Sequence, residues 1–354
     1  MPKKMLNVAA QHDPGAQHAA DRHAVEIDGR LSWLDLATTD ADDAARIQRG
    51  WISIEYDQID RGTFAGRFQQ LEFKETFVAA ERQNRTVLKR LYVPADYCTV
   101  SLIRSASGQG RCGLDAVSNR SVAYMPGSKD YEVLLPPSEI VFFRIPQNRF
   151  LEAADTLGYQ LPGEGRQILF LDGLNPGYLD DMAETLMSIQ HSPVSELFAA
   201  LDYKYLNQVV LERILGVLLD STTKSFRVPL VGAYRITQAA LALIESSAEE
   251  PLTVMTLCRE LEVSRASLQR SFLQIYRVSP LAYLRMRRFN CARRALKAAR
   301  GTGATVASIA MNWGFFHFAR FSQDYFLQFG ELPSTTLGRS GKTKPESGRY
   351  RQQR

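Results

Sequence analysis

The chain has 354 residues, of which 45% are hydrophobic and 23% are charged. That length allows two domains with separate cores, and this composition is typical of a soluble globular protein. No stretch approaches the roughly 18 consecutive apolar residues that a membrane span needs, and no apolar secretory segment follows Lys3 and Lys4. We therefore expect a cytoplasmic protein without a membrane partner, with its four widely spaced cysteines reduced.

Positive charge is concentrated toward the C-terminal end. Residues 229–354 contain 19 Lys and Arg against 8 Asp and Glu, a net charge of +11 that leaves −6 for residues 1–228. A basic module joined to a mildly acidic one suggests a polyanionic partner for the C-terminal part. A basic face is commonly only solvated, so charge alone does not decide the matter.

The N-terminal half changes character near residue 46. Residues 1–45 are polar and poorly periodic, which predicts a loosely ordered segment. Over 46–170, short segments rich in β-branched and aromatic residues are separated by Gly and Pro turns. They predict a small β-barrel of cupin-like form, or a β-sandwich, with flanking helices, in a domain that binds an effector. The predicted strands cover residues 52–56, 67–73, 99–103, 121–124, 131–135 and 140–145.

Helical periodicity dominates the rest of the chain. It predicts a helical dimerisation or packing segment over 171–222 and helices throughout 233–338. The polar stretch 223–232 is expected to be a linker, and 339–354 a disordered basic tail. The predicted fold class is α+β with two domains, an N-terminal β-barrel and a C-terminal all-α module.

A weak internal repeat lies in the last third, where segments 52 residues apart align. Cys258 and Ala310 are small residues at which two helices can approach closely, and Val263 and Phe315 can fill the turn between them. This pattern predicts two helix-turn-helix units, whose second helices begin near Ser264 and His317.

Helical geometry then fixes the outward face of each second helix, because its apolar residues at a spacing of four must point inward. Arg and Gln suit guanine and adenine, whereas Phe and Ala can meet only thymine methyls or sugars. The predicted DNA-binding residues are Ser264, Arg265, Ala266, Gln269 and Arg270 in the first unit and His317, Phe318, Ala319, Ser322 and Gln323 in the second.

A long helix predicted from Pro280 to about Ala299 would hold the two reading helices apart. Its inner side is apolar, and its arginines are expected to face water or DNA phosphates, or to form ion pairs within the protein. These arginines are Arg285, Arg287, Arg288, Arg293 and Arg294.

Residues 257–333 resemble the AraC/XylS family of transcription regulators. The family pattern of the second unit is matched by Ile309-Ala310, Gly314-Phe315, Phe321-Ser322-x-x-Tyr325 and Phe329-Gly330-x-x-Pro333. The resemblance implies two recognition helices in adjacent major-groove segments on one face of the duplex. It also implies promoter DNA and RNA polymerase as partners, and activation as the usual outcome. A homodimer is expected from the helical segment 171–222.

A narrower resemblance is to the regulators of ethanolamine utilisation operons. It is carried by Thr253-Val254-x-x-Leu257-Cys258, Val263-Ser264-Arg265 and residues 304–315, and in the first domain by Tyr56-Asp57-Gln58 and Gly62-x-Phe64-x-Gly66. That subgroup implies ethanolamine as the effector with cobalamin as a co-effector. No other cofactor is expected.

Catalytic signals are weak. Residues 108–113 match GxGxxG, but no helix is predicted after these glycines, which favours a hairpin turn over a dinucleotide site. None of the five histidines falls between residues 51 and 145, so a cupin-type metal site lacks ligands and no metal or catalytic residue is expected. Two alternatives stay open, a non-specific architectural nucleic-acid-binding protein and, less favoured, a cupin-type enzyme. Effector-binding residues are not assigned, since Tyr124, Tyr131, Phe142 and Phe143 fit a core as well as a pocket.

Overall fold

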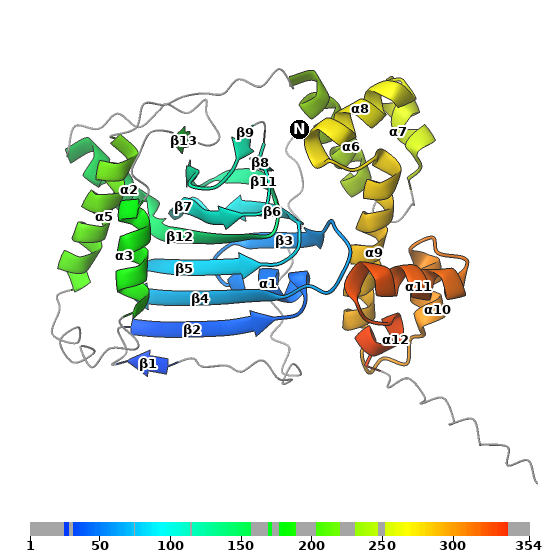
Figure 1. The fold of residues 1–354 in the computed structure, drawn as a ribbon, viewed down its shortest axis with the longest axis horizontal. Coiled ribbons are helices and arrows are strands. Elements are labelled where there is room, and N and C mark those ends of the chain that lie inside the picture. The colour runs from blue at the N-terminus through cyan, green and yellow to red at the C-terminus, as the bar shows by residue number, and fades with distance from the viewer. Residues whose placement is uncertain are drawn as a thin grey trace, which may run out of the picture.

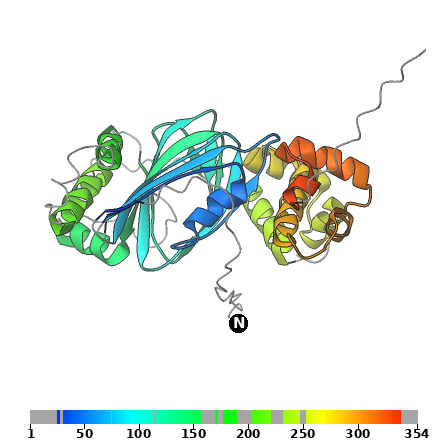
Figure 2. The same ribbon diagram turned by 90° about the horizontal axis from the view of Figure 1, so that it is seen from below.

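The structure is a computed structural model that describes residues 25–27, 31–73, 75–113, 115–156, 169–171, 177–188, 203–219, 231–246 and 252–338. A β-rich N-terminal domain and a helical C-terminal module lie side by side (Figure 1). Figure 2 shows the same arrangement from below, with a group of helices at the end of the β domain far from the module. Among the described helices, none combines the length and apolar character that crossing a membrane requires.

The described strands form two antiparallel sheets instead of one closed barrel. The larger has the order β1 (Val25–Ile27), β2 (Leu31–Thr38), β4 (Gly66–Phe73), β5 (Thr76–Gln83), β12 (Ser138–Pro146), β7 (Tyr97–Ala106), β10 (Val122–Met125), β13 (Leu169–Leu171). The smaller has the order β3 (Ser53–Gln58), β6 (Val87–Val93), β11 (Lys129–Leu135), β8 (Gly110–Cys112), β9 (Asp115–Val117). The predicted α+β class with an N-terminal β domain is confirmed, in a two-sheet form.

Helices cover one face of the larger sheet. They are α2 (Gln147–Thr156), α3 (Gly177–Ser188) and α5 (Tyr203–Leu219). Leu179, Ala183 and Ile214 from α3 and α5 join a buried cluster with sheet residues such as Val78 and Val141. This accounts for the near-continuous burial along β5, because both faces of the strand are covered. The segment predicted for packing therefore packs on its own domain; self-association stays a prediction.

The prediction of a loosely ordered segment over 1–45 is wrong for its second half. Residues 31–38 form β2, which pairs along its length with β4, and α1 (Ala41–Gln48) follows it. Among the β2 residues whose burial is described, only Trp33 is deeply buried, so the strand lacks a strong alternating signal. Residues 1–24 lie outside the described residues, as do the tail 339–354 and most of the predicted linker.

The C-terminal module contains seven described helices: α6 (Val231–Ser246), α7 (Val254–Glu260), α8 (Arg265–Tyr276), α9 (Pro280–Ala298), α10 (Val306–Asn312), α11 (Phe318–Phe329) and α12 (Pro333–Thr336). Hydroxyl caps set several of their starts: the side chains of Thr253, Ser264, Ser279 and Thr305 each accept a backbone N–H of the following turn. The helical interpretation of 233–338 is confirmed for the described residues.

Gly330 ends α11 and contacts the β domain at the same point. Its φ is +75°, and an added Cβ would lie 2.0 Å from Oγ1 of Thr63. We expect Gly330→Ala to lower the free energy of unfolding by about 1–3 kcal/mol, since left-handed strain and an interdomain clash add.

Gly301 is the matched control for this substitution. Its φ is +77°, and no atom lies within 4 Å of the place that an added Cβ would take, so Gly301→Ala isolates the conformational strain. Urea denaturation of both variants measures the difference. Equal losses would show that Thr63 moves aside freely and that this contact contributes little.

Candidate nucleic-acid interface

The first helix-turn-helix unit consists of α7 and α8. Ser264 caps α8, with its Oγ accepting the backbone N–H of Ser267 at 3.1 Å. Leu268 and Phe272 are buried against the rest of the module. The opposite face carries Arg265, Ala266, Gln269 and Arg270, and these residues and Ser264 are exposed.

The second unit consists of α10 and α11 and repeats this arrangement. His317 precedes α11 but forms no side-chain capping hydrogen bond, unlike Ser264. Phe321 and Tyr325 are buried, whereas Phe318, Ala319 and Gln323 are exposed and Ser322 is half-buried. The outward faces of α8 and α11, called the reading faces because they carry the predicted DNA-binding residues, are thus accessible. Exposure does not test contact with DNA, so the role of the ten residues stays a prediction.

An aromatic cluster anchors the second unit to α9. The ring of Phe289 on α9 lies 4.5 Å from that of Phe315 and 5.8 Å from that of Phe321, between centroids. Phe315 occupies the turn between α10 and α11, as the internal repeat predicts. The helix α9 therefore belongs to the cores of both units, with Tyr283 and Leu284 in the first and Phe289 and Leu296 in the second.

The arginines of α9 are engaged within the protein. Arg287 and Arg294 pair with Asp57 of β3 at 3.0 and 2.9 Å, and Arg293 pairs with Asp40. Arg285 pairs with Asp324 inside the module, and Arg288 donates to the carbonyl of Leu252. The expectation that they face water or phosphates is therefore corrected in favour of the intramolecular alternative.

Asp57 is the centre of the largest of these clusters. Its carboxylate is fully buried and receives Arg90 at 2.6 Å in addition to the two α9 arginines. Burial alone would raise the pKa of Asp57, but the three guanidinium groups outweigh it and hold the pKa far below its usual range. Asp57 is therefore ionised and links the β domain to α9 at all ordinary pH values.

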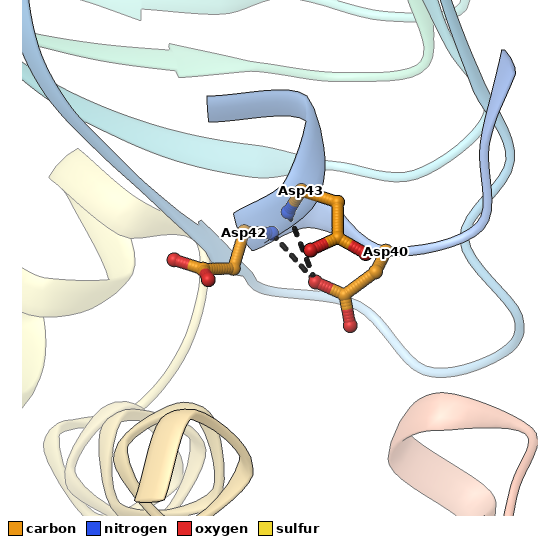
Figure 3. A group of neighbouring side chains, drawn as sticks. All are labelled: Asp40, Asp42 and Asp43. Carbon is orange, nitrogen blue, oxygen red and sulfur yellow. Dashed lines mark hydrogen bonds between the residues drawn. The ribbon is translucent and has the colours of Figure 1, made fainter. Parts of the chain in front are cut away.

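A second cluster of carboxylates lies at the start of α1 (Figure 3). Asp40, Asp42 and Asp43 have oxygen atoms close enough together to hold a metal ion. Asp40, however, caps α1 by accepting the backbone N–H groups of Asp42 and Asp43, and its other oxygen meets Arg293. Lys297 bridges Asp40 and Asp43 at 2.7 and 2.9 Å. The cluster is thus used as a helix cap and an interdomain ion-pair network, and it supports no metal assignment.

Glu132 of β11 makes a third interdomain contact. It accepts the hydroxyl of Tyr276 and, at 3.3 Å, the amide of Gln238. Burial raises its pKa, although these hydrogen bonds and Arg90 oppose the rise. A carboxylate with a raised pKa supports the fold most fully below its unfolded pKa of about 4.3, and this support is lost as pH rises through the folded value.

We therefore expect Glu132→Gln, which keeps an oxygen acceptor without the charge, to gain stability relative to the wild type between pH 4 and pH 8. Urea denaturation at both pH values measures the change. A difference between variant and wild type that does not vary with pH would contradict it.

A cavity that is partly open to solvent lies between the two sheets, and about 750 Å³ of empty space, the open part included, lies within its lining. Most of its lining is apolar, including Ile54, Leu91, Met125, Val133 and Phe142. Of the four aromatic residues considered from the sequence, only Phe142 lines it; Tyr124, Tyr131 and Phe143 belong to the cores. The polar end of the cavity consists of four residues in mutual contact, Gln48, Tyr56, Glu81 and Lys89. The hydroxyl-bearing residues Thr99, Ser101 and Ser121 also line the cavity.

Sequence comparison identifies the class of domain that this geometry defines. Residues 257–339 match the family described as "Helix-turn-helix domain". The chain is 36% identical over 102 residues to the "Probable thc operon regulatory protein" of Rhodococcus erythropolis, covering 29% of this chain and 31% of that protein. It is 28% identical over 137 residues to "XylDLEGF operon transcriptional activator 3" of Pseudomonas putida, covering 38% and 40%.

The likeness is thus confined to a part of each chain. This protein spans about a third of the length of the first of these relatives and two fifths of the second. Among solved structures it resembles the AraC-like transcriptional activator CuxR, with 15% identity, a TM-score of 0.38, and coverage of 78% of this chain and 99% of that one.

Proposed function

We propose that the protein is a sequence-specific, DNA-binding transcription regulator of the AraC/XylS type. The observation that carries the proposal is the pair of exposed reading faces on α8 and α11, joined by the single helix α9 within a matched helix-turn-helix segment. A rigid connection of this kind suits insertion of both helices into successive major-groove segments. By analogy with the activators named above, the outcome would be activation at a promoter near RNA polymerase.

The β domain would bind a small effector, and α3 and α5 would serve in a homodimer. Its cavity supports the first of these roles, since concave and largely apolar pockets are the usual sites of small ligands. The amine effector with cobalamin has only the short sequence motifs in its support. In the motif Tyr56-Asp57-Gln58, only Asp57 and Gln58 contact α9 and α11, so these two residues indicate a shared architecture more than a particular effector. Tyr56 lines the cavity.

The test is a selection of randomised duplexes with the full chain. We expect two preferred half-sites about one helical turn apart, whereas an architectural protein would select none. In the selected duplex, Arg270→Ala and Gln269→Ala should each relax base preference at one half-site by about 1–3 kcal/mol. Gln323→Ala should act at the other half-site.

Arg259→Ala is the control, because Arg259 is an exposed arginine outside the reading helices. It should leave base preference unchanged even where it weakens binding uniformly. An Arg270→Ala variant that binds the selected and random duplexes with wild-type affinities would remove Arg270 from base reading.

A further inference from the structure

The smaller sheet separates the cavity from the DNA-binding module. Along β3 and β6 successive side chains point to opposite faces, and Tyr56 lies directly opposite Lys89 in the register of the two strands. Tyr56 and Lys89 line the cavity, whereas their neighbours Asp57 and Arg90 turn toward the module. One strand layer therefore has a ligand-facing side and a module-facing side.

The module-facing side is apolar as well as charged. Leu88 and Leu134 are adjacent on β6 and β11, and they join one buried cluster with Leu241, Phe272 and Tyr283 of the module. Arg90 also lies 3.4 Å from the hydroxyl of Tyr283. Together with Asp57 and Glu132, these contacts hold α6, α8 and α9 on the outer surface of the sheet.

On the cavity-facing side of the sheet, some hydrogen-bond donors have no acceptor within the part of the chain that the structure describes. The Glu81 carboxylate already receives Tyr56 Oη at 2.8 Å, Lys89 Nζ at 2.9 Å and Gln48 Nε2 at 3.3 Å. Lys89 is only 4% exposed, and its ammonium has Glu81 as its one ion-pair partner among the described residues. It also lies over the Tyr56 ring, 4.5 Å from the centroid, a contact that supplies no hydrogen-bond acceptor oxygen for its three N–H donors. Trp51, which also lines the cavity, has a buried indole N–H without an acceptor among the described residues. A ligand that complements these donors would supply a hydrogen-bond acceptor.

The charge of a ligand is limited by the same residues. Glu81 and Lys89 neutralise each other, so a charged ligand would bring an unpaired charge into an apolar cavity at a cost of several kcal/mol. A protonated amine would in addition be repelled by Lys89, and a carboxylate by Glu81. An uncharged molecule with a carbonyl-type acceptor can pair with the donors of Lys89 and Trp51 and adds no charge to the cavity.

We propose that the cavity binds an uncharged, mostly apolar small molecule whose acceptor oxygen faces Lys89, and that β3 and β6 couple its binding to the docking of the DNA-binding module. This rests on the proposed function in taking the β domain as the effector domain. A ligand that fills the cavity restricts the cavity-facing side chains of β3 and β6. The opposite side chains of the same strands contact α9, and close-packed interiors transmit small displacements from one face to the other. Binding and docking then favour each other, and the coupling is reciprocal.

The ligand class is tested with probes of one shape that differ in charge and acceptor. Acetophenone is uncharged with one carbonyl, benzoate is its anionic counterpart, and isopropylbenzene lacks the acceptor. Calorimetry with the full chain should show acetophenone binding at least about tenfold more tightly than either. Benzoate binding most tightly, ethanolamine binding most tightly with or without cobalamin, or no binding by any probe would each overturn the assignment.

The role of Lys89 is tested by the paired substitution Glu81→Gln and Lys89→Met, which keeps the cavity neutral. The acetophenone advantage over isopropylbenzene should shrink, because the strongest donor is lost and the Trp51 indole N–H remains, while isopropylbenzene still binds and the thermal transition stays cooperative. The milder Trp51→Phe removes the indole N–H donor together with part of the ring, which lowers the affinity for all three probes alike, so the acetophenone advantage over isopropylbenzene reports on the N–H donor if the double variant does not fold. Retention of the full advantage in either folded variant would overturn that residue's assigned contact.

The coupling is tested at Asp57, which does not line the cavity. Asp57→Asn should weaken acetophenone binding at least about fivefold, at the low end of measured allosteric couplings. Asp324→Asn is the control, because Asp324 pairs with Arg285 of α9 inside the module, and it should leave the affinity unchanged. Small-angle scattering shows whether Asp57→Asn loosens the docked arrangement; loosening with an unchanged acetophenone Kd would overturn the coupling.

The two proposals fail separately. A duplex selection that returns no preferred site, with ligand binding still sensitive to Asp57→Asn, rejects the regulator function alone. A clear selected site with no acetophenone binding rejects only the ligand and its coupling.

Discussion

Replacing Phe289 by alanine is expected to unfold the second helix-turn-helix unit and to abolish binding across both half-sites. The side chain is 3% exposed, and its ring contacts those of Phe315, Phe321 and Tyr325. Truncating a buried Phe costs about 3–5 kcal/mol, because the lost transfer energy adds to the cost of the cavity. That is a large part of the stability of an ordinary domain.

Urea denaturation followed by circular dichroism measures the loss, and fluorescence anisotropy on the selected duplex measures its effect on binding. Phe316→Ala is the matched control, since Phe316 lies in the same unit with 71% of its surface exposed and should change stability by less than about 0.5 kcal/mol. If Phe289→Ala lowers the free energy of unfolding no more than this control does, the aromatic cluster does not hold α11 in place.

The helix-turn-helix units can be predicted from the sequence because their determinants are local. Capping hydroxyls, a small residue at the close approach and an apolar residue in the turn all fall within about 20 residues of one another, and the 52-residue repeat supplies two copies. The start of α8 follows from the capping hydroxyl of Ser264. The start of α11 after His317, which forms no capping hydrogen bond, follows from the alignment of the second repeat with the first. The outward faces then follow from the helical period.

The interdomain contacts cannot be predicted in this way. Asp57 meets Arg287 and Arg294 across more than 200 residues of sequence, and nothing local distinguishes those arginines from the exposed Arg265 and Arg270. All are basic residues on helices, and only the docked β domain decides which of them meet carboxylates. The sequence pattern of α9 is therefore equally consistent with arginines that face solvent, phosphates or carboxylates.

Strand β6 shows a related difficulty. Its Lys89-Arg90 pair gives the segment a polar character, so the sequence pattern predicts no strand there. Lys89 is nevertheless buried, because Glu81 from the other sheet supplies the opposite charge. The cavity likewise depends on contacts between segments that are distant in sequence. Its polar end exists only when β3, β5, β6 and α1 are brought together, and no segment alone indicates it.

Arg293 connects α9 to the β domain and to the second helix-turn-helix unit. Its replacement is expected to lower the free energy of unfolding as much as that of Phe289. It is 8% exposed and pairs with Asp40 of the β domain and with Glu331 at 2.8 Å, and it donates to the hydroxyl of Tyr325 at 3.2 Å. Removing one partner of a buried ion pair costs about 3–5 kcal/mol, because the other charge is left without compensation. Arg293→Met should therefore reduce the free energy of unfolding by this amount at pH 7.

The loss should depend on pH in a defined direction. Burial alone would raise the pKa of Asp40, but Arg293 and Lys297 outweigh it and hold the pKa well below its usual value. A depressed pKa contributes stability above the unfolded pKa of about 3.9, and this contribution is lost as pH falls through the folded value. In Arg293→Met the pKa of Asp40 rises, so the wild-type advantage should be full at pH 7 and should shrink below about pH 4.

Urea denaturation at pH 7 and pH 3.5 checks both parts of this expectation. Adding Asp40→Asn to Arg293→Met provides the control, because Asn remains a good helix cap while the uncompensated carboxylate is gone. The double variant should be more stable than Arg293→Met at pH 7, and the difference in free energy of unfolding between these two variants should shrink at pH 3.5. If single and double variants lose equal stability at both pH values, the cost arises from lost packing of the long Arg293 side chain, and the ion pair with Asp40 does not hold the second unit on the β domain.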